Sequence, residues 1–212
     1  MSTPTEREPD PDSLPGAGRM VAFVDASVAI ALTLLVLQLT ELLPPSDRPD
    51  QPPIDVVTEN APVFWSFLLS FVVIGRFWLV HHRLFGFGGR LTGLLVLLNL
   101  AWVLTIVVLP FMTEMVATYG SEPFVLRTYI GVLLVCSGLL TAMTVLMRRT
   151  ALAEDDPRRP PEAFVVGSTA ATVDVGLAFL LVLVLPQVNY FALFALFLDP
   201  LTTRVVQRLR RT

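Results

Sequence analysis

Lysine is absent from this chain of 212 residues, so all 15 basic residues are arginine. The absence excludes a retinal pigment, which needs a lysine Schiff base, and a P-loop, whose motif requires a lysine. The one cysteine, Cys136, has no partner for an internal disulfide. The two histidines form no Cys/His pattern with zinc spacing. We therefore expect no enzyme, no cofactor and no resident metal.

Apolar residues are what the chain has in abundance, at 54% of its length. So large a fraction is rare in a soluble domain, and runs of about 20 apolar residues are long enough to cross a bilayer as helices. We expect an all-α integral membrane protein with six transmembrane helices. The segments are 20–43, 62–83, 92–113, 124–147, 163–185 and 188–203. The turn at Pro186 and Asn189 is very tight, so the last two segments could instead be half-spans.

The positions of the arginines indicate an orientation. With six spans, twelve arginines fall on one side of the membrane, Arg48 and Arg127 fall on the other, and Arg76 lies within the second span. The positive-inside rule then places both termini in the cytoplasm. The expected organisation is a disordered cytoplasmic tail (1–18), a six-helix transmembrane domain (19–204) and a basic cytoplasmic C-terminus (205–212).

Ionisable residues inside the spans are costly and are therefore candidates for function. Asp25 lies about 9 Å from Arg19 along the first span, at 1.5 Å per residue. His81 and Asn99 lie near the cytoplasmic ends of the second and third spans. We therefore expect Asp25 to contact His81 or Asn99 in the cytoplasmic leaflet. These groups could also serve only to lock helices together by hydrogen bonds, and Asp25 could in addition sense protons.

A second pair of charges lies deeper in the spans. Arg76 belongs to the second span, and Asp174 lies near the middle of the fifth. Because the charge of each residue can neutralise that of the other, we expect the pair to have a structural role.

The first span carries a stripe of side chains on one face. Ile30, Thr33, Leu34 and Leu37 follow the i, i+3, i+4, i+7 spacing and share an arc of about 100°. Asp25 lies well away from the centre of that arc. On periodicity alone, the stripe could contact lipid or another helix.

Three motifs carry a family resemblance. The run RMVAFVDASVAIALTLLVLQL, from Arg19 to Leu39, resembles the signature of the transmembrane protein 175 potassium channels, whose first helix carries R-x-x-x-F-S-D. The runs FWLVHHRLF and NLAWVLTIVVLPF resemble that family's second and third helices, so the match covers about 19–115. The resemblance implies a homotetramer of six-helix subunits in the bacterial cell membrane, with a central pore lined by the first helix.

The resemblance also assigns roles to residues. Ile30 matches an apolar constriction that Leu34 and Leu37 would continue, and Thr33 matches a hydroxyl layer that selects potassium. The motif and its polar network correspond to Arg19, Phe23, Asp25, Trp78, His81 and Asn99. Potassium would be the permeant ion, the partners would be further copies of the chain and membrane lipid, and no nucleic acid is expected. One departure is Val24, which stands where the motif has serine.

Two other classes of function remain as alternatives. A secondary transporter or proton pathway could relay protons through Asp25, His81 and Asp174. Transporters often carry internal repeats, and no convincing repeat is evident within the six spans. A membrane-embedded enzyme would need a richer set of acid and base groups than two adjacent histidines provide.

Overall fold

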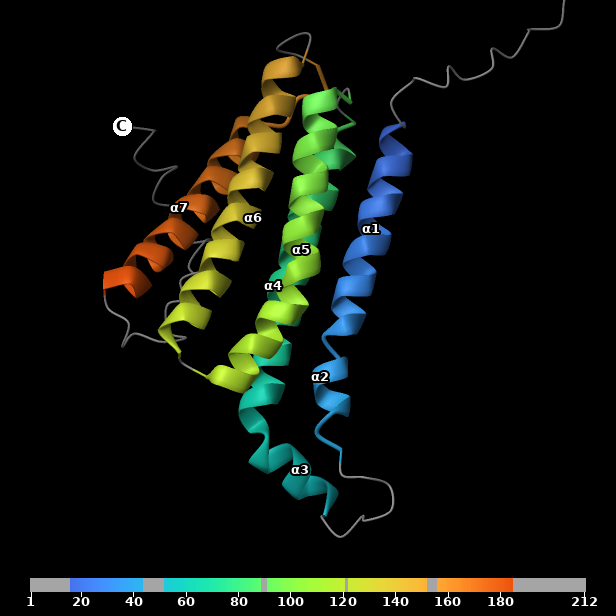
Figure 1. Cartoon of the computed structure of the whole chain (residues 1–212). Helices are drawn as coiled ribbons and strands as arrows, with labels where there is room; N and C mark the ends of the chain where they lie inside the picture. The colour runs from blue at the N-terminus through green and yellow to red at the C-terminus, as the bar shows by residue number, and fades with distance from the viewer. Residues whose placement is uncertain (1–15, 44–51, 89–90, 121, 152–155, 185–212) are drawn as a thin grey trace, which may run out of the picture.

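The structure, a computed structural model, describes residues 16–43, 52–88, 91–120, 122–151 and 156–184. This part of the chain is helical. Its helices are α1 (Ala17–Leu34), α2 (Leu37–Thr40), α3 (Pro53–Glu59), α4 (Ala61–Gly86), α5 (Gly93–Tyr119), α6 (Pro123–Thr150) and α7 (Glu162–Val184) (Figure 1). Five segments are long and apolar enough to cross a membrane: α1 with α2, α4, α5, α6 and α7. The predicted all-α membrane protein is thus confirmed, and five predicted spans coincide with helices. The sixth predicted span, 188–203, lies outside the described residues.

Local sequence signals account for where the helices begin and end. Proline occupies the first turn of α3, α4 and α6, where its missing N–H costs no hydrogen bond. Thr92 caps α5, because its side chain accepts a hydrogen bond from the Leu95 N–H at 3.2 Å. The same helix ends at Gly120, whose φ of +61° is a conformation that glycine adopts without strain. The short helix α3 lies in a connector for which the sequence analysis predicted no helix.

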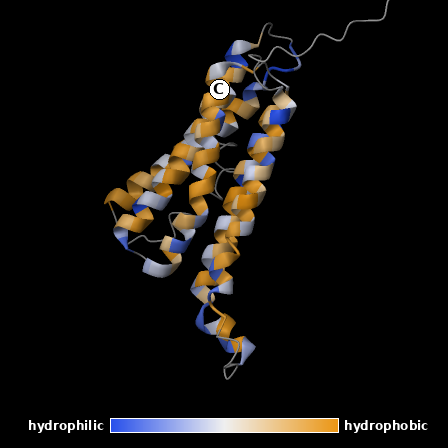
Figure 2. Cartoon of the chain, turned by 45° about the vertical axis from the view of Figure 1, so that its right-hand side comes forward, coloured by the Kyte–Doolittle hydropathy of each residue, from blue (hydrophilic) through white to orange (hydrophobic). Residues whose placement is uncertain are grey.

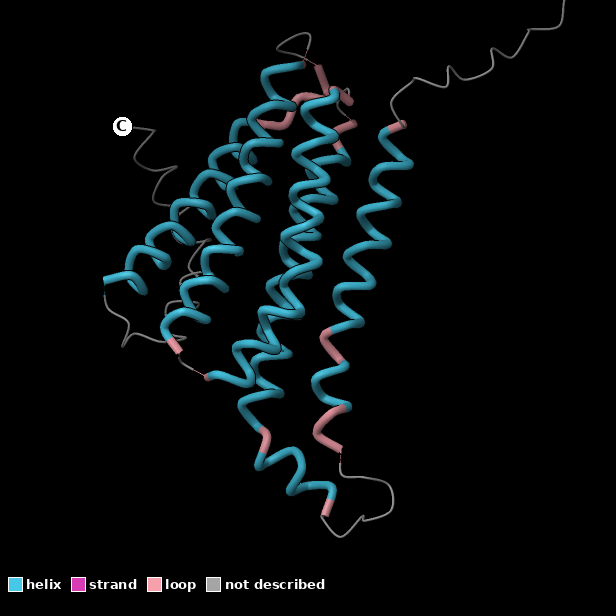
Figure 3. The backbone as a smooth tube through the Cα atoms, in the orientation of Figure 1, coloured by secondary structure: helices cyan, strands magenta, loops and turns pink. Residues whose placement is uncertain are grey.

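The first predicted span is interrupted at Leu35 and Val36, between α1 and α2 (Figure 3). The Val36 N–H donates to the Thr33 carbonyl at 3.2 Å, which is the tighter i to i−3 pattern of a 3₁₀ turn. Gln38 then donates to the Leu35 carbonyl at 3.0 Å through its side-chain amide. The break therefore comes immediately after the predicted threonine layer.

Helix α5 organises the bundle, because it packs against α1, α4 and α6. Helix α7 packs against α6, at the edge of the bundle opposite α1 (Figure 1). The side chains of Trp102, Ile106 and Leu109 on α5 and of Ile130 and Leu133 on α6 are almost completely buried between the helices. Hydrophobic residues dominate the long helices in Figure 2, and many of their large apolar side chains, such as those of Ile30, Leu104 and Leu177, are exposed. Such a surface is suited to lipid.

Hydroxyl groups join α6 to α7 in the interior. The Thr141 hydroxyl lies 2.7 Å from the Ser168 hydroxyl, 2.8 Å from the Thr172 hydroxyl and 2.9 Å from the Ser168 carbonyl. Ser137 extends the cluster, with its hydroxyl 2.9 Å from that of Thr172. In a membrane such groups find no water, so they satisfy one another across the helix interface.

We predict that Thr141→Val loosens the contact between α6 and α7, because valine keeps the shape of threonine but none of its hydrogen bonds. The expected loss is about 0.5–1.5 kcal/mol of unfolding free energy. The matched control is Thr169→Val, since the exposed Thr169 hydroxyl bonds only to the Val165 carbonyl of its own helix, at 2.8 Å. Denaturant unfolding in detergent micelles measures both variants, and equal losses would contradict the assigned role of the cluster.

Candidate functional site

Helix α1 has a packed face and an open face. On the packed face, Val24, Val28, Ala31 and Leu35 recur at intervals of three or four residues and are almost completely buried. They belong to the hydrophobic core that α1 forms with α4 and α5. Val24, which stands in place of the motif serine, is fully buried. A hydroxyl at this position would have to find a partner inside an apolar contact.

The open face carries a regular stripe of exposed residues, which we call the α1 stripe. Its members alternate at spacings of four and three: Arg19, Phe23, Ala26, Ile30, Thr33, Leu37 and Thr40, with Leu34 beside them. Phe23, Ile30 and Leu37 are 51%, 60% and 54% exposed. A mean spacing of 3.5 residues is the repeat by which helices pack around a common axis. This repeat was available in the sequence but extends beyond the four residues that the analysis singled out.

Thr33 has a defined orientation within the stripe. Its hydroxyl donates a hydrogen bond to the Ile30 carbonyl at 2.8 Å. The proton is thereby committed to the backbone, while the oxygen keeps lone pairs that can accept from water or contact a cation. Ile30, Thr33, Leu34 and Leu37 all lie on the open side of the helix. That they line a pore remains a prediction.

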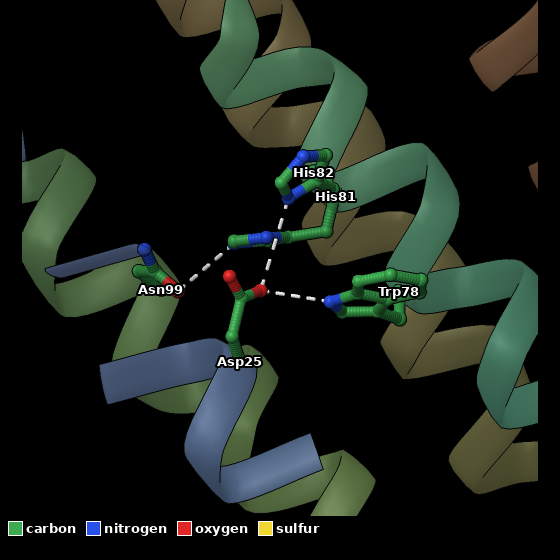
Figure 4. A network of polar contacts seen from close by, with 5 residues as sticks. All are labelled: Asp25, Trp78, His81, His82 and Asn99. Carbon is green, nitrogen blue, oxygen red and sulfur yellow. Dashed lines mark hydrogen bonds and ion pairs between the residues drawn. The ribbon is translucent and has the colours of Figure 1, made fainter. Parts of the chain in front are cut away.

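Asp25 lies at the side of α1 that faces α4 (Figure 4). The Trp78 indole N–H donates to its Oδ1 at 2.7 Å. The same oxygen lies 3.9 Å from Nδ1 of His82. The rings of Trp78 and His82 pack against each other with centroids 5.5 Å apart. Together these contacts anchor α1 to α4 near the predicted cytoplasmic end of both helices.

His81 makes a separate contact with α5. Its Nε2 lies 3.3 Å from Oδ1 of Asn99. Its ring is fully buried, stacked between Phe85 and Trp102 with centroid distances of 4.5 Å on each side. The pair therefore ties α4 to α5, as the Asp25 cluster ties α4 to α1.

The expectation that Asp25 contacts His81 or Asn99 is corrected by this arrangement. Successive residues of a helix point about 100° apart, so His81 faces α5 while His82 faces α1. Trp78 lies four residues before His82 and shares its face. That spacing was the signal in the sequence for the pair that holds Asp25. Arg19 and Phe23, which match the family motif, are exposed along the α1 stripe.

The deeper charge pair borders a cavity. Arg76 interacts electrostatically with Asp174, which is largely buried. Arg76 also lines a cavity of about 240 Å³ between α4, α6 and α7. The pair was predicted from the sequence, and the cavity was not.

Comparison with known proteins is consistent across sequence and structure. The family model described as "Endosomal/lysosomal potassium channel TMEM175" matches residues 19–110. A potassium channel of Streptomyces collinus is 30% identical over 173 residues, which cover 77% of this chain and 82% of that protein. A potassium channel of a Chryseobacterium species is 29% identical over 146 residues, covering 69% of this chain and 71% of that protein.

Animal relatives and a solved structure extend the comparison. The endosomal/lysosomal proton channel TMEM175 of Rattus norvegicus is 28% identical over 128 residues, which is 60% of this chain but 24% of the rat protein. The crystal structure of a lysosomal potassium-selective channel TMEM175 homolog from Chamaesiphon minutus superimposes with a TM-score of 0.70 at 20% identity. The superposition covers 89% of this chain and 96% of that one. The two proteins therefore share a fold.

We predict that Trp78→Phe destabilises the subunit by about 1–2 kcal/mol, because phenylalanine keeps the ring packing but cannot donate to the Asp25 carboxylate. Asp25→Asn should cost less, since its amide oxygen still accepts from Trp78. The control is Trp65→Phe on the same helix, whose side chain is 70% exposed. Thermal unfolding in detergent compares the three, and a Trp65 effect as large as the Trp78 effect would count against the anchor.

Proposed function

Because this chain belongs to the TMEM175 family, we propose that it is a subunit of a potassium-selective cation channel in the bacterial cell membrane. Its subunits have six spans and cytoplasmic termini, and four of them surround a central pore. The relatives from Streptomyces and Chryseobacterium that match most of their own length are named potassium channels. The observation that carries the proposal is the α1 stripe, an exposed face with a repeat suited to a helical bundle.

Assembly around an axis gives the stripe a function. In the described part of one subunit α1 lies at the edge, with its stripe turned away from the other helices, whereas four copies of α1 can surround an axis and enclose a path for an ion. In such a bundle each stripe position becomes a ring of four identical side chains. Ile30 then forms an apolar collar, with Leu34 and Leu37 continuing the wall, and Thr33 forms a ring of hydroxyls.

The two rings act differently on an ion. They lie about 4.5 Å apart along the axis, since three residues rise 1.5 Å each. An ion inside the Ile30 collar loses contacts with water and gains none from methyl groups. The Thr33 oxygens, whose protons are held by the Ile30 carbonyls, can replace part of that hydration. This arrangement favours potassium over sodium, because potassium is the cheaper ion to dehydrate.

Proton conduction is the second candidate. The rat relative is named a proton channel, and this chain pairs two titratable groups, Asp25 and His82, at 3.9 Å. Planar-bilayer recording of the purified protein separates the two functions. In asymmetric potassium and sodium at equal pH, a potassium channel reverses near the potassium equilibrium potential. A current that follows an imposed pH gradient and ignores potassium would replace the proposal with the second candidate.

We predict that Ile30→Ala raises single-channel conductance several-fold, because a smaller side chain widens the apolar collar and eases its wetting. Leu177→Ala is the control, since Leu177 is comparably exposed but lies on α7, at the opposite edge of the subunit. Conductance is measured in symmetric potassium. An unchanged conductance in Ile30→Ala would place the constriction elsewhere.

We predict that Thr33→Val shifts the reversal potential toward equal permeability for potassium and sodium, while the tetramer stays intact. Valine preserves the shape of threonine but removes the oxygen that replaces hydration. The control is Thr128→Val, whose exposed hydroxyl bonds only to the Phe124 carbonyl of α6. Bi-ionic reversal potentials and size-exclusion profiles test both variants. If the reversal potential of Thr33→Val equals that of the unmodified channel, Thr33 is not a selectivity element.

A further inference from the structure

The arrangement of Ile30 and Thr33 recurs seven residues further along, on the open face of α2. The Thr33 hydroxyl donates to the Ile30 carbonyl at 2.8 Å, and the Thr40 hydroxyl donates to the Leu37 carbonyl at 2.7 Å. In both pairs an exposed apolar side chain is followed three residues later by an exposed threonine, whose proton is held by the backbone. Each threonine oxygen keeps lone pairs that can contact a cation. Thr40 therefore has the chemistry of Thr33, at a position that the proposed function leaves without a role.

The break between α1 and α2 does not turn Thr40 away from the open face. The buried residues of the packed face continue through the break, from Ala31 and Leu35 to Gln38, which is 7% exposed. Thr40 follows Gln38 by two residues, so its side chain points about 160° away from that of Gln38. Helix α2 also contacts α4, as α1 does. Thr33 and Thr40 therefore lie on the same face, about 10 Å apart along the helix, since seven residues rise 1.5 Å each.

A carboxylate lies beside Thr40. Glu41 is exposed, and within the described part of the chain its carboxylate has no hydrogen bond or ion pair. It points about 100° from Thr40 around the helix, so it lies at the border of the open face. From there a carboxylate attracts a cation through its electric field, without direct contact. Rings of glutamate side chains give pores a preference for cations.

We propose that four copies of Thr40 and Glu41 form a second potassium site, at the outward mouth of the pore. The inference rests on the proposed function, which places four copies of the stripe around one axis with residue numbers rising outward. The Leu37 ring then lies between the two threonine rings. The Glu41 carboxylates raise the local concentration of potassium, and the Thr40 oxygens contact the ion before it loses water in the Leu37 ring.

The two parts of the site act over different distances, so each can be tested separately. The field of Glu41 extends about 30 Å in 0.01 M salt and about 3 Å in 1 M salt, because dissolved ions screen it. Thr40 acts by contact, so salt does not weaken its effect. Single-channel recording in outside-out patches keeps the outward mouth toward a solution that can be exchanged.

The first test removes the charge of Glu41. Glu41→Gln should lower the inward potassium conductance about two-fold in 0.01 M external potassium and leave it unchanged in 1 M. The matched control is Glu122→Gln. Glu122 is an exposed carboxylate at the same end of the bundle, but it precedes α6, with α4 and α5 between it and α2 (Figure 1). Equal changes in the two variants would show that Glu41 acts only as general surface charge, and would overturn the proposal.

The second test removes the hydroxyl of Thr40. With an impermeant salt holding the ionic strength at about 1 M, Thr40→Val should raise the potassium concentration of half-maximal conductance about three-fold. Thr40→Ser, which keeps the hydroxyl, should restore the unmodified value. The control is Thr58→Val, since the exposed Thr58 hydroxyl bonds only to the Ile54 and Asp55 carbonyls of α3. An unchanged value in Thr40→Val, or a Thr40→Ser variant that behaves like Thr40→Val, would show that no ion contacts this hydroxyl.

Failure of this site is distinguishable from failure of the proposed function. If the variants assemble by size exclusion and carry the unmodified potassium current under both conditions, the outward site is wrong and the channel stands. If the unmodified protein carries no potassium current, the proposed function and the outward site are both wrong.

Discussion

The hydrogen bond from Trp78 to Asp25 fixes the rotation of α1, and the candidate pore face depends on that rotation. Asp25 precedes Ile30 by five residues, which places the two side chains about 140° apart around the helix. When the carboxylate is held against α4, Ile30 must turn away from the subunit, and Thr33, about 60° from Ile30 around the helix, is exposed on the same side. The packing of the buried residues Val24, Val28, Ala31 and Leu35 favours the same rotation of α1. The apolar packing and the hydrogen bond thus specify the same rotation of α1. Contact with lipid alone would not specify a rotation, because every apolar face of the helix interacts with lipid equally well.

The interior of the bundle follows the rule that polar groups in a membrane must satisfy one another. The cluster of Thr141, Ser168 and Thr172 joins α6 to α7. Another cluster joins α4, α5 and α6, where the Thr113 hydroxyl donates to that of Ser70 at 2.8 Å and Ser70 lies 3.2 Å from the Tyr129 hydroxyl. These contacts specify the register of helices whose apolar surfaces would tolerate sliding. The α1 stripe differs, since its Thr33 oxygen is turned outward from the subunit.

Sequence reasoning located five membrane helices because hydropathy and length are properties of each segment alone. It also located Ile30 and Thr33 on one face, since helical periodicity fixes angles within a helix. It included Trp78 in the network of Asp25 but named His81 or Asn99 as the contact where the structure has His82, because the rotation of α4 about its own axis decides which histidine faces α1. That rotation is set by the stacking of His81 on Trp102 of α5, a contact between helices, while Phe85 of α4 covers the other face of the ring. The break after Leu34 and the helix α3 were missed for a related reason, since both depend on short-range hydrogen bonds that apolar runs do not reveal.

The geometry of α1 also explains why valine can stand at position 24, where the family motif has serine. Val24 and Asp25 are neighbours in sequence and therefore point about 100° apart, the first into the apolar core and the second toward Trp78. A serine at position 24 would add a hydroxyl to the cluster only if it found an acceptor among the buried side chains around it. Valine instead adds apolar contact area against α4 and α5 and leaves the anchoring of α1 to Trp78 and His82. The chain thus holds α1 in place with one hydroxyl fewer than the family motif provides. The orientation of α1 therefore depends more strongly on the contacts of Asp25 with Trp78 and His82.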